Sequence, residues 1–265
     1  MRFAPIASGS SGNCIYVGSN NTHLLVDVGI SGKRVDEGLR NLDLTGHDID
    51  GILITHEHVD HIGGLGVLCR KYSIPVYATR DTILAIKSYN YLGKVDDDIF
   101  HPIAPDVDLK IKDMTIKAFR INHDATDPVA YTFCADGKKI AIATDMGTYS
   151  EYTVQNLKGM DSLLIEANHD VRMLQVGPYP YPLKQRILSD SGHLSNELSG
   201  RLISSILNDK IENIFLGHLS KENNLPELAY ETVRVEIDMS DNKYRSNDFR
   251  IMVAKRDQMS EVVNL

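Results

Sequence analysis

Three histidines and one aspartate lie within six residues of the segment ITHEHVDHIGG. These are His56, His58, Asp60 and His61. The apolar run Gly51 to Thr55 before them is typical of a strand, so we expect the cluster at the carboxyl end of that strand, where α/β sheets favour ligands. On extended backbone His56 and His58 point the same way. Asp60 and His61 lie in the turn into the next helix and can approach from another side.

Imidazole and carboxylate ligands of this kind suit zinc, manganese or iron(II). A structural zinc site is usually closed by four ligands with cysteine prominent, whereas this set leaves room for water. Solvated surface histidines are the alternative interpretation. It is disfavoured because polar groups crowded behind an apolar strand are costly to bury without a partner. The segment therefore predicts an open metal site.

The tetrapeptide Gly-His-Leu-Ser occurs twice, around His193 and around His218. His218 follows the apolar run IENIFL, so it is expected at a strand's carboxyl end like the other candidate ligands. His193 comes shortly before a helical pattern for which Ser195 is a suitable N-cap, and a loop at a helix start favours an anion. Position alone therefore assigns His218 to a metal and His193 to the substrate side.

Apolar runs typical of strands alternate with helical patterns over most of the chain. The middle is antiparallel, with two strands predicted to join at the tight turn Asp136–Gly137. This order predicts an α/β fold with helices outside central sheets, built as a single domain over residues 1–265. The segment VGPYPYPLKQR, from Val176 to Arg186, is predicted as an irregular insertion.

Composition restricts where the protein works and what it binds. The chain has 265 residues and a formal net charge of −8, which argues against a broadly basic nucleic-acid-binding surface but not against a local positive site. No apolar run approaches the roughly 20 residues of a membrane span, and the N-terminus lacks a signal segment. Cys14, Cys69 and Cys134 are odd in number and far apart, which favours three buried thiols in a reducing cytoplasm.

The H-x-H-x-D-H pattern resembles the signature of the metallo-β-lactamase superfamily. The resemblance implies a four-layer αβ/βα sandwich and two divalent metal ions, manganese or zinc, with iron as a further candidate. Asp27, at the end of LLVDVG, resembles the acidic residue that supports the histidine loop from behind. His123 in INHDATDPVAY resembles the next ligand, and Asp145 in IAIATDMG resembles the carboxylate shared by both metals.

The family pattern implies two ligand sets that share Asp145. The first metal would take His56, His58, His123 and Asp145. The second would take Asp60, His61, Asp145 and His218. Two such metals can hold a hydroxide between them, so a nucleophile is available at neutral pH and no catalytic serine is needed. Asp60 is therefore counted as a catalytic residue as well as a ligand.

The segments LLIEANHD and SDSGHLSNE are similar to the nuclease branch that contains ribonuclease Z, ribonuclease J and the β-CASP enzymes. Carried over, Glu166 would orient His193, which would contact phosphate or protonate the departing oxygen, a role suited to a histidine with a carboxylate partner. Only about two dozen residues separate Glu166 from His193, whereas β-CASP enzymes insert a whole domain between the corresponding residues.

The segments IASGSSGNC and GHLSKENN resemble those of the YycJ (WalJ) family, which implies a metal-dependent DNA exonuclease acting from the 5′ end.

Five further residues are predicted to contact the substrate. Ser8, Ser10, Ser11 and Asn13 lie in a Gly-rich turn whose hydroxyls and amides could hold a phosphate, although a simple tight turn is an equal alternative. Asn196 follows the loop that carries His193.

DNA is favoured over RNA as the partner. The competing functions are an RNA-processing nuclease and a small-molecule hydrolase such as a lactonase, thioesterase or cyclic phosphodiesterase, although an uncharged ester needs no phosphate-side pair.

The segment predicted as an irregular insertion also has residues suited to a nucleic-acid end. Tyr179 and Tyr181 could stack on bases, and Arg172, Lys184 and Arg186 could contact phosphates. An ordinary surface loop of the same composition is the alternative.

Overall fold

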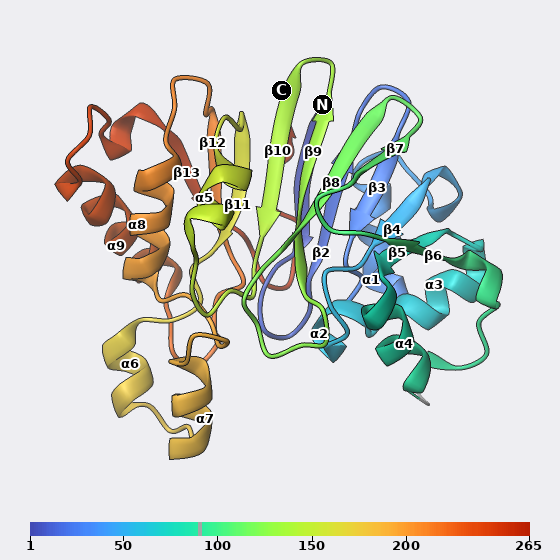
Figure 1. Ribbon diagram of the computed structural model, residues 1–265, viewed down its shortest axis with the longest axis horizontal. Helices are drawn as coiled ribbons and strands as arrows, with labels where there is room; N and C mark the ends of the chain where they lie inside the picture. Colours follow the sequence, from blue (N-terminus) through green and yellow to red (C-terminus); the bar gives the residue numbers. More distant parts are fainter. Residues whose placement is uncertain (90–91) are drawn as a thin grey trace.

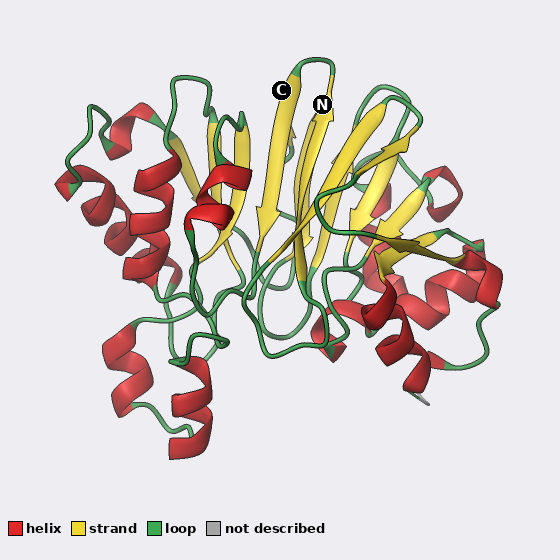
Figure 2. Cartoon of the chain, in the orientation of Figure 1, coloured by secondary structure: helices red, strands yellow, loops and turns green. Residues whose placement is uncertain are grey.

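The computed structural model describes residues 1–89 and 92–265, which form two β-sheets packed face to face between two layers of helices (Figures 1 and 2). The first 7-stranded sheet has the order β14-β1-β2-β3-β4-β5-β6, and the second has the order β13-β12-β11-β10-β9-β8-β7. The predicted arrangement of helices outside central sheets, in four layers, is confirmed.

The strands of the first sheet are β1 (Arg2–Ala7), β2 (Cys14–Gly18), β3 (His23–Val26), β4 (Gly51–Leu53), β5 (Val76–Thr79), β6 (Phe100–Ile103) and β14 (Val263–Asn264). Those of the second are β7 (Asp108–Ile111), β8 (Met114–Arg120), β9 (Val129–Ala135), β10 (Lys138–Ala143), β11 (Ser162–Glu166), β12 (Asn213–Gly217) and β13 (Arg250–Val253). The α-helices are α1 (Gly32–Arg40), α2 (Val59–Ile62), α3 (Leu65–Tyr72), α4 (Arg80–Ser88), α5 (Glu151–Leu157), α6 (Val171–Val176), α7 (Tyr181–Ile187), α8 (Asn196–Ile206) and α9 (Pro226–Met239). Short 3-10 turns are η1 (Gly46–Asp48), η3 (Asp97–Ile99) and η4 (Ser246–Asp248).

The alternation of side chains along each strand produces the layers. In β2, Cys14 and Tyr16 pack on the helix side of the first sheet, whereas Ile15 and Val17 pack between the two sheets. Successive side chains of a strand point to opposite faces, so a strand with apolar residues at every position is buried on both sides. A third apolar cluster joins the second sheet to α5, α8 and α9. This packing leaves the strand ends as the places where polar side chains can gather.

Three of the candidate site residues at strand ends lie in the left-handed backbone region. Asp27 after β3, Asp145 after β10 and His218 after β12 have φ values of 56°, 61° and 53°. The conformation costs on the order of 1 kcal/mol for such residues and is common at functional sites, where the surrounding structure enforces it. β3 pairs in parallel with β4, and β12 lies in parallel with β11 and β13, so the carboxyl ends of these strands share an edge of their sheets.

The prediction of an irregular insertion from Val176 to Arg186 is wrong in part, because helix α7 begins within this segment. Helix α6 precedes it and ends at Val176. Asp170 caps α6 by accepting a 2.7 Å hydrogen bond from the Met173 backbone N–H. Pro182 lies in the first turn of α7, where the missing backbone donor is harmless. In Figure 1 the two helices project from the lower end of the sandwich, beyond both sheets.

The three cysteines differ in exposure, which corrects the expectation that all are buried. Cys14 and Cys69 are buried, and Cys134 is partly exposed. Burial raises the pKa of Cys69 to about 12 and raises that of Cys14 further still. Because the thiolate is the reactive form, we expect a thiol reagent at pH 8 to modify one cysteine in the native protein and three after denaturation. Cys134→Ser should abolish the native reaction; modification of a second native thiol would contradict the burial.

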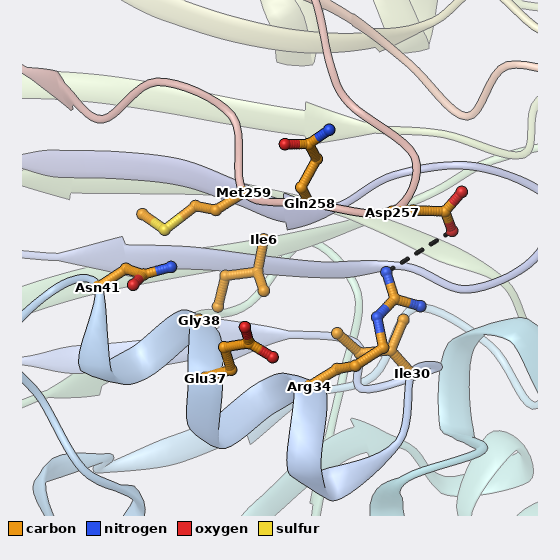
Figure 3. Close-up of a pocket in the computed structure, with 9 residues that line it drawn as sticks. All are labelled: Ile6, Ile30, Arg34, Glu37, Gly38, Asn41, Asp257, Gln258 and Met259. Atoms are coloured by element: carbon orange, nitrogen blue, oxygen red, sulfur yellow. Dashed lines mark ion pairs between the residues drawn. The ribbon is translucent and has the colours of Figure 1, made fainter.

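A small cavity of about 100 Å³ lies between α1 and the segment after β13 (Figure 3). The Arg34 guanidinium and the Asp257 carboxylate form an ion pair of 3.8 Å at its edge. The residues that line it offer no histidine, so it is not the predicted metal site. Among the described helices, none combines the length and the apolar character needed to span a membrane.

Candidate metal centre

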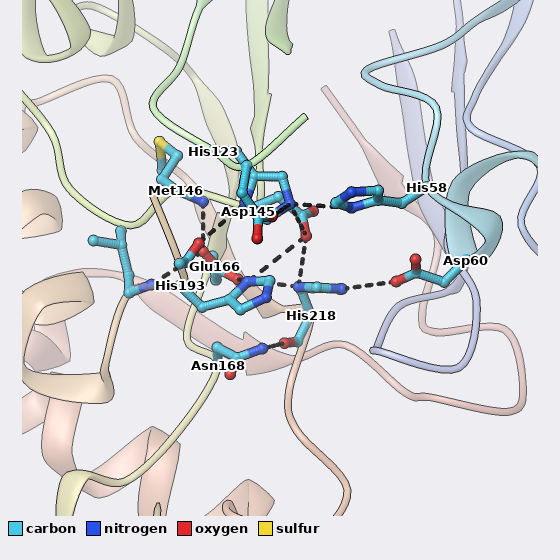
Figure 4. Close-up of polar contacts among 12 residues, drawn as sticks. His58, Asp60, His123, Asp145, Met146, Glu166, Asn168, His193 and His218 are labelled. Atoms are coloured by element: carbon cyan, nitrogen blue, oxygen red, sulfur yellow. Dashed lines mark hydrogen bonds and ion pairs between the residues drawn. The ribbon is translucent and has the colours of Figure 1, made fainter. Parts of the chain in front are cut away.

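One group of predicted ligands consists of three histidines from two loops. Donor atoms of His56, His58 and His123 lie within 4.8 Å of one another. His58 Nδ1 is 3.3 Å from His123 Nε2 (Figure 4), and the two rings meet edge to face with an interplanar angle of 74°. His56 and His58 have ring centroids 4.7 Å apart, as expected for neighbours on the same side of extended backbone. The first predicted ligand set is thus brought together although 65 residues separate His58 from His123.

The second group consists of Asp60, His61 and His218, whose donor atoms meet the same distance limit. Asp60 Oδ2 lies 3.5 Å from His61 Nε2 and 3.4 Å from His218 Nε2. Asp145 lies between the two groups, with Oδ2 3.4 Å from His61 Nε2 and Oδ1 3.8 Å from His123 Nε2. One carboxylate therefore reaches both sets, as the resemblance implied.

Two atoms of this cluster are buried without a hydrogen-bond partner among the described residues: His56 Nε2 and Asp145 Oδ2. Burial holds the pKa of His56 well below its usual value, and the neighbouring histidines lower it further. A neutral imidazole offers a lone pair, and a buried carboxylate oxygen that accepts no hydrogen bond favours a cation that offsets its desolvation. This nitrogen and oxygen donor set therefore fits divalent metal ions.

The other histidines of the cluster are strongly coupled to carboxylates. Burial by itself lowers the pKa of His218, but attraction to Asp145 and hydrogen bonds to Asp60 and Glu166 raise it to about 10. The pKa of His61 is likewise raised well above its usual value: burial lowers it, and Asp145, Asp60 and Asp27 outweigh that effect. Protons and cations must therefore compete for these imidazoles, because a metal ligand is the neutral form.

This competition predicts a pH dependence of metal affinity. A raised pKa keeps the proton bound below about pH 10, so the proton is released when metal binds. We expect the dissociation constant for Mn²⁺ to rise roughly tenfold per pH unit, for each proton displaced, as pH falls from about 8 to about 6. Calorimetric titration in buffers of different ionisation enthalpy counts the released protons. Binding without proton release would contradict this coupling.

Asp27 lies behind the histidine loop, where the resemblance placed it. Its Oδ2 is 2.8 Å from His61 Nδ1, and its Oδ1 accepts a 2.9 Å hydrogen bond from the Thr55 backbone N–H. The Thr55 hydroxyl also donates to Asp27 and lies 3.0 Å from His56 Nδ1. Asp27 and Thr55 thus orient two ligand rings. Thr55 was not singled out in the sequence, because one threonine at a strand end carries no motif.

An Asp27→Asn substitution is expected to weaken metal binding about 10- to 100-fold, since carboxylates behind ligand histidines have effects of this size. Asp113→Asn is the matched control, because Asp113 also accepts hydrogen bonds, from Ser19 and Thr22, but at the amino end of β3. Metal titration with a chromophoric chelator measures both variants. An equal loss in both would show general destabilisation instead.

Glu57 is a further residue that sequence reasoning missed. Its Oε1 accepts hydrogen bonds from the backbone N–H and the hydroxyl of Thr126, at 2.8 and 2.6 Å. These bonds tie the first histidine loop to the loop that carries His123. The only sequence signal is its place between His56 and His58, where its side chain points away from theirs.

His193 and Glu166 form the predicted pair. His193 Nδ1 lies 2.7 Å from Glu166 Oε1 (Figure 4), and the other carboxylate oxygen accepts from the backbone N–H groups of Met146 and Leu194. Burial would raise the pKa of Glu166, but attraction to His193 and hydrogen bonds from both neighbouring histidines hold it below the usual range. An ionised carboxylate only accepts, so Nδ1 of His193 is the donor and Nε2 is left for the site.

Glu166 also touches the second copy of the repeated tetrapeptide. Its Oε1 lies 3.0 Å from His218 Nδ1, so one oxygen serves both histidines. Exposure distinguishes them: the side chain of His193 is 17% exposed and that of His218 is 2% exposed. Asn168 holds the His218 backbone carbonyl through a 2.9 Å hydrogen bond. His218 is therefore a fixed group inside the cluster, whereas His193 lies at its surface.

The residues predicted to contact substrate divide into two kinds. Ser10 and Ser11 are exposed at the Gly-rich turn and stay candidates for phosphate contact. Ser8 is buried and accepts a 2.9 Å hydrogen bond from the His218 backbone N–H. Asn13 is buried too, with its amide 3.1 Å from His61 Nε2. We assign Ser8 and Asn13 a supporting role beside the ligands.

Asn196 is fully buried and differs most from its predicted role. Its side-chain amide donates to Asn224 Oδ1 at 2.9 Å, and its backbone N–H donates to the His169 carbonyl. Ser195 caps α8, as predicted, by accepting from the Leu198 backbone N–H. We therefore assign Asn196 to the support of the His193 loop in place of substrate contact.

Comparison with known proteins agrees with this geometry. The profile of the metallo-beta-lactamase superfamily matches residues 7–218. Exodeoxyribonuclease WalJ of Streptococcus pneumoniae serotype 2 (strain D39) is 43% identical over 241 residues, which are 91% of this chain and 90% of the relative. Exodeoxyribonuclease YycJ of Bacillus anthracis is 40% identical over 233 residues, 88% of each chain. The solved structure of Zn²⁺-bound PqqB from Methylobacterium extorquens has the same fold, with a TM-score of 0.74 over 100% of both chains at 16% identity.

The two sheets between helices and the histidine motif at the strand ends define a class of α/β protein with a site for divalent metals. The chain belongs to the metallo-β-lactamase superfamily and, within it, to the family of the WalJ and YycJ proteins.

Proposed function

We propose that the protein is a metal-dependent phosphodiesterase, a DNA exonuclease that removes nucleotides from the 5′ end. The observation that carries the phosphodiester chemistry is the Glu166–His193 pair beside the metal cluster. Two relatives that match most of the chain are named exodeoxyribonucleases, which supports DNA as the substrate. The 5′ polarity follows from the family resemblance.

His56, His58, His123 and Asp145 would hold one divalent ion, and Asp60, His61, Asp145 and His218 the other. Such ions supply a nucleophile at neutral pH and stabilise charge on the reacting phosphate. Glu166 keeps a proton on Nδ1 of His193 and leaves Nε2 for the substrate. When Nε2 is also protonated, it would donate that proton to the departing oxygen and leave the ring neutral. The buried Asp27 and Thr55 hold the ligand rings in place. Manganese and zinc both suit this donor set, and we place the activity in the cytoplasm.

Two alternative functions have the same metal cluster. An RNA-processing nuclease would need the same phosphate-side pair. A lactonase or thioesterase is disfavoured because an uncharged ester or lactone has no use for a histidine and carboxylate poised beside a phosphate, whereas a cyclic phosphodiesterase could use the same pair. The partial exposure of His193, against the burial of His218, favours a group that meets a substrate.

The test is purified protein with Mn²⁺ or Zn²⁺, offered DNA and RNA labelled at the 5′ or the 3′ end. We expect metal-dependent release of nucleotides from the 5′ end of DNA, faster than from RNA. Lack of cleavage of all these nucleic acids, together with rapid hydrolysis of lactones or thioesters, would overturn the proposal.

A further inference from the structure

Helices α6 and α7 and the turn between them form a projection that the metal chemistry does not use. We call residues 171–187 the arm. In Figure 1 it extends from the lower end of the sandwich, the end at which β11 and β12 run into the loops of the candidate site. Its tip is the segment Pro-Tyr-Pro-Tyr-Pro, from Pro178 to Pro182.

The base of the arm is fixed to the metal centre. Arg186 forms a two-pronged ion pair with Asp124, in which Nη2 lies 3.0 Å from Oδ1, and Asp124 follows the ligand His123 directly. The His193 backbone N–H donates a 3.0 Å hydrogen bond to the carbonyl of Ile187, the last residue of α7. The arm therefore continues into the loop that presents His193, and its position relative to the site is set by these bonds.

The surface of the arm is basic and partly apolar. Residues 171–187 include three basic residues and no acidic one, in a chain whose formal net charge is −8. Asp124 neutralises Arg186, but neither Arg172 nor Lys184 lies in an ion pair within residues 1–89 and 92–265; the Lys184 ammonium donates to the Gln175 carbonyl. Tyr181 is 73% exposed.

The three prolines of the tip restrict its backbone. Each proline fixes its own φ and limits the residue before it, so Tyr179 and Tyr181 are held between restricted neighbours. A tip with few conformations loses little entropy when it binds a ligand, which favours a rigid aromatic surface for stacking. Base stacking on aromatic side chains combined with cations along the backbone is the usual way to bind single strands.

We propose that the arm holds single-stranded nucleotides of the DNA next to the cleaved phosphate, with Tyr181 stacked on a base and Arg172 and Lys184 contacting phosphates. This inference rests on the proposed function and adds the surface that positions its substrate. A second copy of this chain is the other conceivable occupant of the arm. A symmetric contact between two arms would bring their unneutralised cations together, which is unfavourable.

Binding is tested with a fluorescent single-stranded oligonucleotide whose linkages are all phosphorothioate, added to the metal-loaded protein. Tyr181→Ala should weaken binding roughly 5- to 100-fold, and Tyr181→Phe should restore it, because either ring can stack. Met239→Ala is the matched control, since Met239 is 79% exposed at the end of α9. Hydrolysis of a small chromogenic phosphodiester by each variant measures its active fraction.

The cations are tested by salt dependence. Arg172→Gln combined with Lys184→Gln should reduce the slope of log affinity against log salt by about 1.4, or roughly 0.7 for each phosphate contact on single strands. Lys210→Gln is the control: Lys210 is exposed just before β12, at the strand end opposite to His218. The slope of log affinity against log salt for Lys210→Gln should equal that of the wild type.

Equal affinity of Tyr181→Ala and the wild type would overturn the role of the arm, even if the wild type degrades DNA. A wild-type dimer that becomes monomeric with Tyr181→Ala, at unchanged DNA affinity, would overturn it in favour of a subunit contact. Tyr181-dependent binding without any cleavage of unmodified DNA would support the arm and overturn the proposed function instead.

Discussion

Replacement of His193 by alanine is expected to slow DNA hydrolysis by roughly 10²–10⁴-fold while the protein keeps its metal. The histidine is bonded through Nδ1 to Glu166 and is the exposed member of the two related histidines. A group that delivers a proton to the departing oxygen affects the rate of the chemical step and leaves the ligand sets intact. The loss should therefore appear in kcat, with metal content unchanged.

Single-turnover rates and metal analysis by mass spectrometry measure the two effects in the same samples. His101→Ala is the matched control, because His101 is an exposed histidine stacked on Tyr77 in β5 and lies outside the metal-binding groups. A substrate with a leaving group that needs no proton should restore much of the rate of His193→Ala. A rate loss accompanied by loss of one metal would show that His193 is a ligand.

Replacement of His218 by alanine has the second large effect: bound metal is expected to fall toward one ion per chain. His218 Nε2 lies 3.4 Å from Asp60 Oδ2 and its Nδ1 lies 3.4 Å from Asp145 Oδ1, so its ring lies between two carboxylates of the second predicted ligand set. The first group does not include it. Removal of one ligand should therefore empty one site and leave the other.

Because His218 is buried, its substitution could also destabilise the protein. Asp60→Asn is a second variant for the same site, since Asp60 belongs to the same group of candidate ligands and its side chain is 26% exposed. Thermal unfolding of each apoprotein separates loss of metal from loss of fold. If His193→Ala loses a metal and His218→Ala keeps both, the assignments of the two histidines must be exchanged.

The sequence alone determined the local chemistry of the site. His56, His58, Asp60 and His61 are close together because they are close in the chain, so their spacing was sufficient to predict a metal-binding loop. The position of His218 was also predictable from the sequence, because it follows an apolar strand and the carboxyl ends of parallel strands gather at one edge of a sheet. Apolar alternation was likewise sufficient to predict the α/β class and the antiparallel middle, which depend on short-range periodicity.

Only the tertiary structure decided which distant groups share a partner. Glu166 contacts both His193 and His218, and Ser8 accepts from the backbone of His218 across 210 residues of sequence. The contact of Glu166 with His218 depends on the pairing of β11 with β12, and the contact of Ser8 depends on how the two sheets pack. No pattern along one strand specifies either. Helix α7 was missed because prolines and tyrosines suggest a loop, whereas a proline in the first helical turn stabilises a short helix beside the site. Helix α6, which Asp170 caps, ends at Val176, the first residue of the segment predicted to be irregular.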